Sequence, residues 1–289
     1  MTKKIIIEIF EKLNIHVNKI VSANNSYNSN VYIIETDNCK YVFKISNNKQ
    51  KRLNECKYYN YLSKIIPTAK VIDIGEINDI QYNIITFLEG ANLFDEECNS
   101  LNESQIYNTG ILLAKIHSAE LIDEDNDSWI IYLNNVLEKT NDTLEKLFGK
   151  DNKVIVDFLR KFIRLYIEDN YKNSILHMDF RVGNIVIENE DIKLIDLESM
   201  KNGDYVFDFV KMNRIFSKEN FEIFINGYKS IKELDTDFYN KLKFYSFFDS
   251  YTSLYWCVSK NSLDTDFYKL NYNIVMNFLG ELKNGEWNI

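Results

Sequence analysis

The 289-residue chain has few residues of the kinds that build disulfide frameworks and metal sites. Three histidines are too few and too scattered for a histidine-rich metal site. The four cysteines lie far apart and form no paired spacing, at Cys39, Cys56, Cys98 and Cys257. The sequence therefore argues against a structural zinc site and against a disulfide framework, and it favours a reducing compartment.

Long hydrophobic runs and a basic surface are also missing. No apolar stretch approaches the length that crosses a bilayer, and the run Ile5–Ile7 is too short for the core of a signal peptide. The formal net charge is −9, which argues against nonspecific nucleic-acid binding because that binding needs a basic face. We therefore expect a cytoplasmic protein without a membrane or nucleic-acid partner. The acidity also suits a cationic small substrate.

Enough apolar residues are present to build a large core. Hydrophobic residues make up 45% of the chain and aromatic residues 14%, so the protein can fold without cross-links. The length allows one large domain or two modest ones.

The most informative stretch runs from Ile175 to Asn184 and lies between two short apolar runs. The pattern predicts a strand, a polar loop, a second strand, a turn and a third strand. Asp179 and Asn184 stand five residues apart on the loop, and Asp196 follows the third strand. This combination suits metal-assisted phosphoryl transfer, in which Asp179 deprotonates a hydroxyl while Asn184 and Asp196 hold Mg²⁺ against nucleotide phosphates. A hairpin with solvated turn carboxylates is the alternative.

The same residues carry a family resemblance. His177-x-Asp179, four residues, Asn184, and then Ile-Asp196-x-Glu198 resembles the aminoglycoside phosphotransferase and choline kinase family. This resemblance covers residues 17 to about 215. It implies an α+β, bilobal, protein-kinase-like fold, with a five-stranded antiparallel sheet and one helix in the N-terminal lobe and a larger, mostly helical C-terminal lobe. Residues 1–88 would be the nucleotide-binding lobe and residues 89–289 the catalytic and substrate-binding lobe.

The first lobe also contains a lysine where an apolar residue is expected. Lys44 interrupts an apolar strand, and Glu55 lies on the helix predicted to follow it. A buried lysine needs a partner, and in the resembling kinases such a pair grips the α- and β-phosphates. The alternative is that Lys44 points outward from a half-exposed strand. Strand-like segments are predicted at residues 17–23, 30–36, 41–46, 71–75 and 81–87, and a helix at 50–64.

The resemblance implies further nucleotide contacts at both ends of this sheet. The polar loop 24–29, which includes Ser26, would fold over the phosphates and offer N–H groups and hydroxyls. The loop contains no glycine, so an ordinary hairpin turn is the alternative. Thr86 and Leu88 fall at the hinge whose backbone would pair with the base edge. Backbone pairing leaves no side-chain code, so both ATP and GTP stay open.

Three more residues are candidates for the reaction site. Arg181 lies two residues after Asp179, where protein kinases place a lysine, and its guanidinium would bind the phosphoryl group in flight. Glu198 would touch a metal-bound water or the substrate. Asp249 stands in a strongly aromatic predicted helix and would bind an ammonium group by charge and cation–π attraction. The alternative for Asp249 is a hydrated or capped carboxylate on a core helix.

We therefore predict a Mg²⁺-dependent phosphotransferase that moves the γ-phosphate of ATP or GTP to a hydroxyl of a cationic small molecule, with an aminoglycoside-like acceptor ranked first. A choline, amino-alcohol or sugar kinase of the same fold is an alternative, and so is a catalytically silent protein that binds nucleotide or a cation. The sequence contains the complete set of kinase-site candidates, Lys44, Glu55, Asp179, Asn184 and Asp196. This set argues against the silent alternative, because binding alone requires no base beside the metal ligands. The sequence specifies neither the choice between monomer and dimer nor that between a resistance and a metabolic role.

Overall fold

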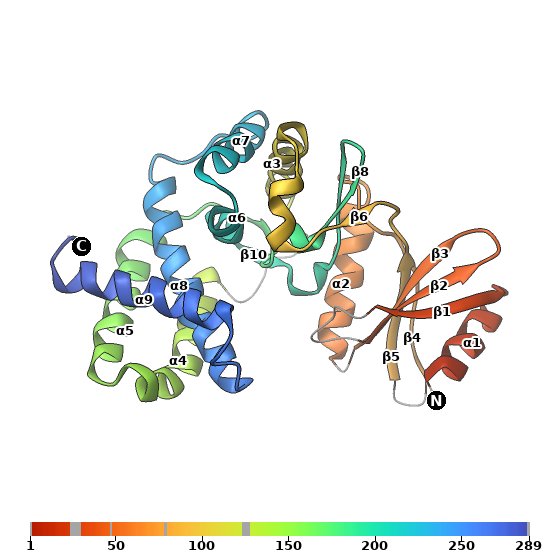
Figure 1. Cartoon of the computed structure of the whole chain (residues 1–289), viewed down its shortest axis with the longest axis horizontal. Helices are drawn as coiled ribbons and strands as arrows, with labels where there is room; N and C mark the ends of the chain where they lie inside the picture. Colours follow the sequence, from red (N-terminus) through yellow and green to blue (C-terminus); the bar gives the residue numbers. More distant parts are fainter. Residues whose placement is uncertain (1, 24–29, 47, 78–79, 123–127, 288–289) are drawn as a thin grey trace. The chain divides into compact units, whose positions relative to one another are not determined.

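The computed structural model describes residues 2–23, 30–46, 48–77, 80–122 and 128–287 (Figure 1). The chain forms two compact units, each built from three separate segments. The first unit contains Met1–Ala119, His177–Lys201 and Ile215–Glu233, and the second contains Glu120–Leu176, Asn202–Arg214 and Leu234–Ile289. The predicted boundary at residue 88 divides the chain into two continuous parts, whereas each observed unit is discontinuous. The boundary therefore stays a prediction.

The first unit begins with the five-stranded antiparallel sheet that the sequence predicts. The strand order is β1-β2-β3-β5-β4, and the strands are β1 (Val17–Ala23), β2 (Asn30–Thr36), β3 (Lys40–Ser46), β4 (Val71–Ile77) and β5 (Ile80–Thr86). Each strand lies within two residues of its predicted bounds. The α+β class and the N-terminal sheet are therefore confirmed.

Two helices pack on opposite faces of this sheet (Figure 1). Helix α1 (Thr2–Lys12) buries Ile6 and Phe10 against sheet residues that include Phe43. Successive side chains of a strand point to opposite faces, so Lys44 points away from α1. Helix α2 (Lys49–Leu62) lies there, and it begins where the Asn48 side chain accepts a hydrogen bond from the Lys51 N–H.

The rest of the first unit packs around a short β-hairpin. Strand β8 (Ile185–Glu188) pairs with β9 (Asp191–Leu194) and, on its other side, with β6 (Ala91–Asn92). Helix α3 (Glu103–His117) holds the hairpin tip, because Gln105 donates from Nε2 to the Asn189 carbonyl (2.8 Å) and Asn108 donates from Nδ2 to the Glu190 carbonyl (3.2 Å). The other elements are η1 (Asp95–Ser100), η3 (Val182–Asn184), η4 (Leu197–Ser199) and α7 (Lys218–Lys229).

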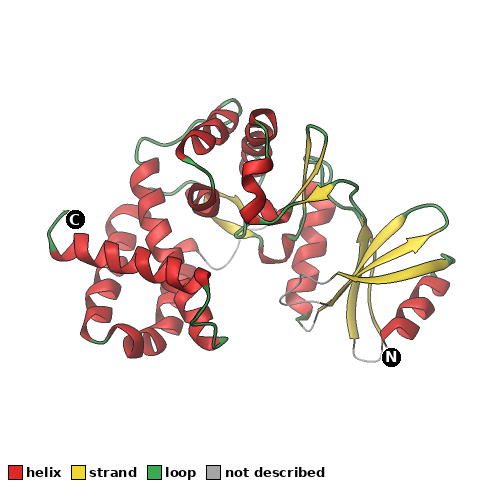
Figure 2. Ribbon diagram, in the orientation of Figure 1, coloured by secondary structure: helices red, strands yellow, loops and turns green. Residues whose placement is uncertain are grey.

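The second unit is mostly helical (Figure 2). Its strand β7 (Asn173–Leu176) pairs with β10 (Lys201–Asp204). The other elements are α4 (Trp129–Phe148), α5 (Lys150–Phe162), the π-helical turn η2 (Ile163–Ile167), η5 (Tyr205–Asp208), α6 (Phe209–Ile215), α8 (Phe238–Ser259) and α9 (Asp266–Lys283). None of the helices in the described ranges combines the length and the apolarity that crossing a bilayer requires.

Candidate active site

Lys44 forms ion pairs with two carboxylates in the first unit. Its Nζ lies 2.5 Å from Oε1 of Glu55 and 3.1 Å from Oδ1 of Asp196. Asn83, directly opposite Lys44 in the β3–β5 register, donates from Nδ2 to the other Glu55 oxygen at 2.9 Å. Burial lowers the pKa of Lys44, but Glu55 and Asp196 outweigh it and hold that pKa well above its usual range. The lysine is therefore a fixed cation.

The loop after β7 is held together by its own polar groups. Asn184 donates from Nδ2 to both the carbonyl (2.8 Å) and Oδ2 (2.9 Å) of Asp179. His177 Nε2 lies 3.0 Å from the Ile195 carbonyl, and the Asp179 N–H donates to His177 Nδ1 at 3.3 Å. These partners assign the hydrogen to Nε2 and leave Nδ1 as the acceptor. His177 therefore anchors the loop, and Asp179 and Asn184 face each other.

The hairpin brings Asp196 next to this loop. The Ile195 N–H donates to the Asn184 carbonyl at 3.0 Å, just beyond the β8–β9 pair of Ile185 and Leu194. Asp196 itself has the left-handed conformation, with φ 64°, which is uncommon outside glycine. Its N–H donates to the buried hydroxyl of Tyr59 on α2 at 3.1 Å. Helix α2 thus fixes the backbone of Asp196 as well as the Lys44 that binds its side chain.

Arg181 also lies in this loop and contacts two carboxylates. Its Nε is 3.4 Å from Oδ2 of Asp179, and its Nη1 is 3.0 Å from Oδ2 of Asp95. Asp95 accepts a second hydrogen bond from the Gly183 N–H at 2.9 Å. No local motif in the sequence marks Asp95, Asn83 or Tyr59, because each meets its partner only in the folded chain.

A family model described as the phosphotransferase enzyme family matches residues 20–240. The chain belongs to this family. No curated protein sequence matches it significantly. The match confirms the family resemblance that the sequence predicts.

Solved structures similar to this phosphotransferase share its fold at low sequence identity. The aminoglycoside phosphotransferase APH(4)-Ia has a TM-score of 0.74 and 15% identity, over 96% of this chain and 97% of that chain. The GDP and kanamycin complex of APH(2")-IIIa has a TM-score of 0.72 and 15% identity, over 99% of both chains. A candidate fructosamine-3-kinase from Haemophilus somnus 129PT has a TM-score of 0.71 and 16% identity, over 94% and 95%. These similarities establish the kinase-like fold.

The phosphotransferase offers two oxygen ligands of the kind that Mg²⁺ prefers. Within the described residues, no hydrogen bond reaches Oδ1 of Asn184 or Oδ2 of Asp196, and the Asp196 side chain is 40% exposed. The described residues contain no cluster of three His, Cys, Asp or Glu side chains suited to one metal ion. Mg²⁺ binds through one or two protein oxygens together with substrate phosphates and water, so two oxygens fit it.

The remaining nucleotide candidates fall at different places. Thr86 ends β5, and its backbone N–H donates to the Lys70 carbonyl at 2.9 Å. Leu88 follows outside any strand, and no hydrogen bond joins its backbone to another residue in the described ranges. Ser26 lies outside the described residues. Oε1 of Glu198 forms an ion pair with Nζ of Lys51 on α2 at 3.0 Å, and the Glu198 side chain is 14% exposed. Any substrate contact of Glu198 would therefore compete with Lys51.

Asp249 lies in the second unit and has a partner there. Its Oδ2 is 2.7 Å from Nη2 of Arg214, and both side chains are nearly buried. The charge of Asp249 is therefore compensated by a guanidinium, and an ammonium ligand would have to compete with it.

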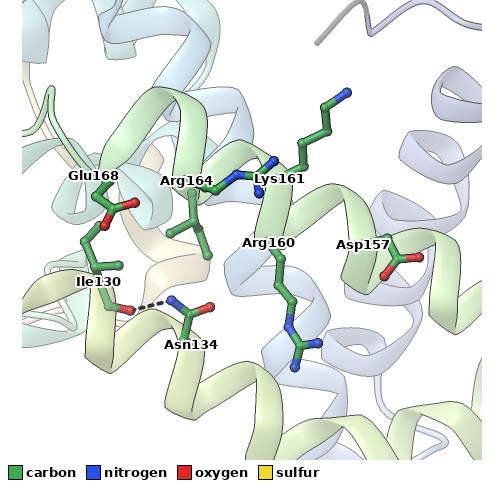
Figure 3. A pocket seen from close by; sticks show the side chains of 8 residues that line it. Ile130, Asn134, Asp157, Arg160, Lys161, Arg164 and Glu168 are labelled. Atoms are coloured by element: carbon green, nitrogen blue, oxygen red, sulfur yellow. Dashed lines mark hydrogen bonds between the residues drawn. The ribbon is translucent and has the colours of Figure 1, made fainter.

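The second unit also contains an open pocket of about 470 Å³ (Figure 3). Helices α4 and α5 and the π-helical turn line it, and none of its residues belongs to the predicted site. The lining carries both signs of charge, from Asp157, Arg160, Lys161, Arg164 and Glu168. This mixed set does not favour a ligand of one charge.

Proposed function

We propose that this phosphotransferase is a Mg²⁺-dependent kinase that transfers the γ-phosphoryl group of ATP or GTP to a hydroxyl of a small cationic molecule. One observation carries the proposal: Lys44 bridges Glu55 and Asp196, while Asn184 bonds to Asp179 in the same unit. Silent nucleotide binding does not require a base next to the metal ligands. We also infer a cytoplasmic location, on the sequence evidence alone.

Each residue has a distinct part in this reaction. Asp179 orients the acceptor hydroxyl and accepts its proton, and Asn184 fixes that carboxylate by its side-chain hydrogen bond. Lys44 neutralises nucleotide phosphates, and Glu55 holds the lysine. Asn184 Oδ1 and Asp196 would hold Mg²⁺, which supplies positive charge against the phosphates when bound. Positioning matters more than basicity here, because the transition state of phosphoryl transfer is loose.

Arg181 would stabilise charge on the phosphoryl group during transfer. Its guanidinium already lies beside the Asp179 carboxylate, within reach of the group that Asp179 activates. We expect Arg181→Ala to lower kcat far more than it weakens nucleotide binding, as measured by steady-state kinetics and by nucleotide titration. Equal losses in both quantities would contradict a transition-state role.

The order of the acceptor candidates follows from the charge of the protein and from its resemblance to solved structures. APH(4)-Ia and APH(2")-IIIa are aminoglycoside phosphotransferases, and the net charge of −9 suits a polycationic acceptor. An aminoglycoside-like acceptor therefore ranks first. The fold similarity to a candidate fructosamine-3-kinase keeps a sugar-derived acceptor as the second candidate, and choline-like amino alcohols as the third.

Acceptor-dependent release of nucleoside diphosphate tests the proposal. The purified protein would be given Mg²⁺, ATP or GTP and a panel of aminoglycosides, choline, ethanolamine, sugars and fructosamines. We expect one acceptor class to stimulate release by the wild type and not by Asp179→Ala, with nucleotide binding retained in the variant. Tight Mg-nucleotide binding with no stimulated release by any acceptor would favour the silent alternative.

A further inference from the structure

The carboxylate of Asp95 lies outside the sequence motif and binds the loop between β7 and β8 at two points. This loop, which carries Asp179 and Asn184, is the reaction loop. Asp95 begins η1, seven residues after Leu88 in the chain. Its Oδ1 accepts the Gly183 N–H at 2.9 Å, and its Oδ2 accepts from Nη1 of Arg181 at 3.0 Å. Both carboxylate oxygens of Asp95 therefore accept hydrogen bonds from the loop segment that lies between Asp179 and Asn184. The side chain is only 26% exposed, which strengthens these charge-assisted bonds.

The surrounding contacts fit this grip. Asn92 donates from Nδ2 to the carbonyls of Gly183 (3.0 Å) and Ile185 (2.8 Å), so the segment 92–95 contacts the loop from both its N–H and its C=O side. A Cβ atom on Gly183 would lie 2.5 Å from Nη1 of Arg181. Glycine therefore leaves the space in which the guanidinium lies against the loop backbone.

Without Asp95, the guanidinium would have one carboxylate partner instead of two. Arg181 already lies 3.4 Å from Oδ2 of Asp179 through its Nε, and its side chain is 36% exposed and long enough to turn. A guanidinium bound to Asp179 alone would cover the carboxylate that must meet the acceptor hydroxyl. Asp95 counteracts this by holding the far side of the guanidinium.

We propose that Asp95 is a positioning residue, which holds the Nη1 end of the Arg181 guanidinium so that only its Nε contacts the Asp179 carboxylate, and which fixes the loop backbone at Gly183. Its effect on turnover rests on the function proposed above, whereas its grip on the loop does not. Asp95 therefore acts through Arg181 and touches no reacting atom. It also links the segment after the hinge to the reaction loop.

Amide exchange in the nucleotide-free protein tests the grip without any turnover. We expect hydrogen exchange in the peptide containing Gly183 to be faster in Asp95→Ala than in the wild type, because the Gly183 N–H loses its acceptor. Glu96→Ala is the matched control, since Glu96 is the exposed neighbour of Asp95 and has no contact with Arg181 or Gly183 in the described residues. Unchanged exchange in Asp95→Ala would overturn the proposal. Asp95→Leu, which is close in size to aspartate but offers no acceptor oxygen, replaces Asp95→Ala if that variant does not fold.

A double-mutant cycle tests the action through Arg181. We expect Asp95→Asn to lower kcat about 10- to 100-fold, the scale of a small displacement at a reacting site, with the nucleotide KM nearly unchanged. In an Arg181→Gln background the same change should have almost no further effect. An equal loss of kcat in both backgrounds would mean that Asp95 is only structural. If the wild type phosphorylates no acceptor while exchange at Gly183 responds as expected, the proposed function fails and the grip of Asp95 stands.

Discussion

Two glycines allow α3 and α7 to pack backbone against backbone in the first unit. A Cβ on Gly110 would lie 2.0 Å from the Phe224 carbonyl oxygen and 2.7 Å from the Tyr228 nitrogen. On the facing helix, a Cβ on Gly227 would lie 2.0 Å from the Tyr107 carbonyl oxygen. These neighbours are backbone atoms, which cannot turn aside as a side chain can. Gly110→Ala must therefore push the two helices apart.

The expected effect of Gly110→Ala is a clear loss of stability, although alanine is the better helix former. Alanine would gain about 1 kcal/mol over glycine inside a helix. Overpacking against immovable atoms costs about 3 kcal/mol or more at the upper end of its usual range, which leaves a net loss of about 2 kcal/mol. For a chain of 289 residues that loss lowers Tm by about 3 °C. The buried side chains of α3, among them Leu112 and Leu113, would lose contacts at the same time.

Gly280→Ala is the control with the opposite expected sign. Gly280 lies in α9, and a Cβ there would meet nothing within 4 Å, so only the propensity gain of up to about 1 kcal/mol remains. Circular dichroism should follow both units during thermal unfolding. All three tryptophans, Trp129, Trp256 and Trp287, lie in the second unit, so their fluorescence follows that unit alone. A Gly110→Ala variant as stable as the wild type, or stabilised like Gly280→Ala, would refute the backbone packing.

Three further changes test other contacts. Tyr59→Phe removes the hydroxyl that accepts the Asp196 N–H. We expect a loss of about 1 kcal/mol in unfolding experiments and a higher Mg²⁺ requirement for turnover, and unchanged values in both would contradict the contact. Glu55→Gln removes the charge that holds Lys44; we expect nucleotide Kd to rise about tenfold or more in titrations, and a change below twofold would contradict the role. Burial raises the pKa of Asp204 from 3.8 to about 6, although Lys241 opposes this shift. The stability that Asp204 contributes is therefore fully present below about pH 4, and it is lost as the pH rises through about 6. Urea unfolding should therefore show the wild type losing about 3 kcal/mol relative to Asp204→Asn between about pH 4 and pH 7, and parallel pH profiles would refute this.

The sequence was sufficient for the elements whose signals are local. An apolar strand interrupted by Lys44 and a helix carrying Glu55 predict a pair on one face of the sheet, because strand periodicity fixes which way Lys44 points. The spacing of Asp179 and Asn184 likewise places both on one loop, and the structure joins them by two hydrogen bonds.

The rest of the site depends on contacts between distant parts of the chain. Asp95 meets Arg181 across 86 residues and Tyr59 meets Asp196 across 137, and neither residue has a sequence neighbour that marks it. Asp249 looks like an unpaired carboxylate in an aromatic helix, but Arg214 pairs with it from 35 residues away. Such partners are set by tertiary packing and leave no periodic pattern in the sequence.

The measurement that tests the central claim most directly follows the phosphoryl group itself. The protein would be incubated with Mg²⁺, a nucleotide isotopically labelled in its γ-phosphoryl group and the acceptor that stimulates turnover, and the acceptor would be analysed by mass spectrometry. We predict that the wild type places the label on an acceptor oxygen and that Asp179→Ala, with its nucleotide affinity intact, does not. Equal labelling by the Asp179→Ala variant, or label found only in free phosphate, would contradict the claim that Asp179 activates an acceptor hydroxyl.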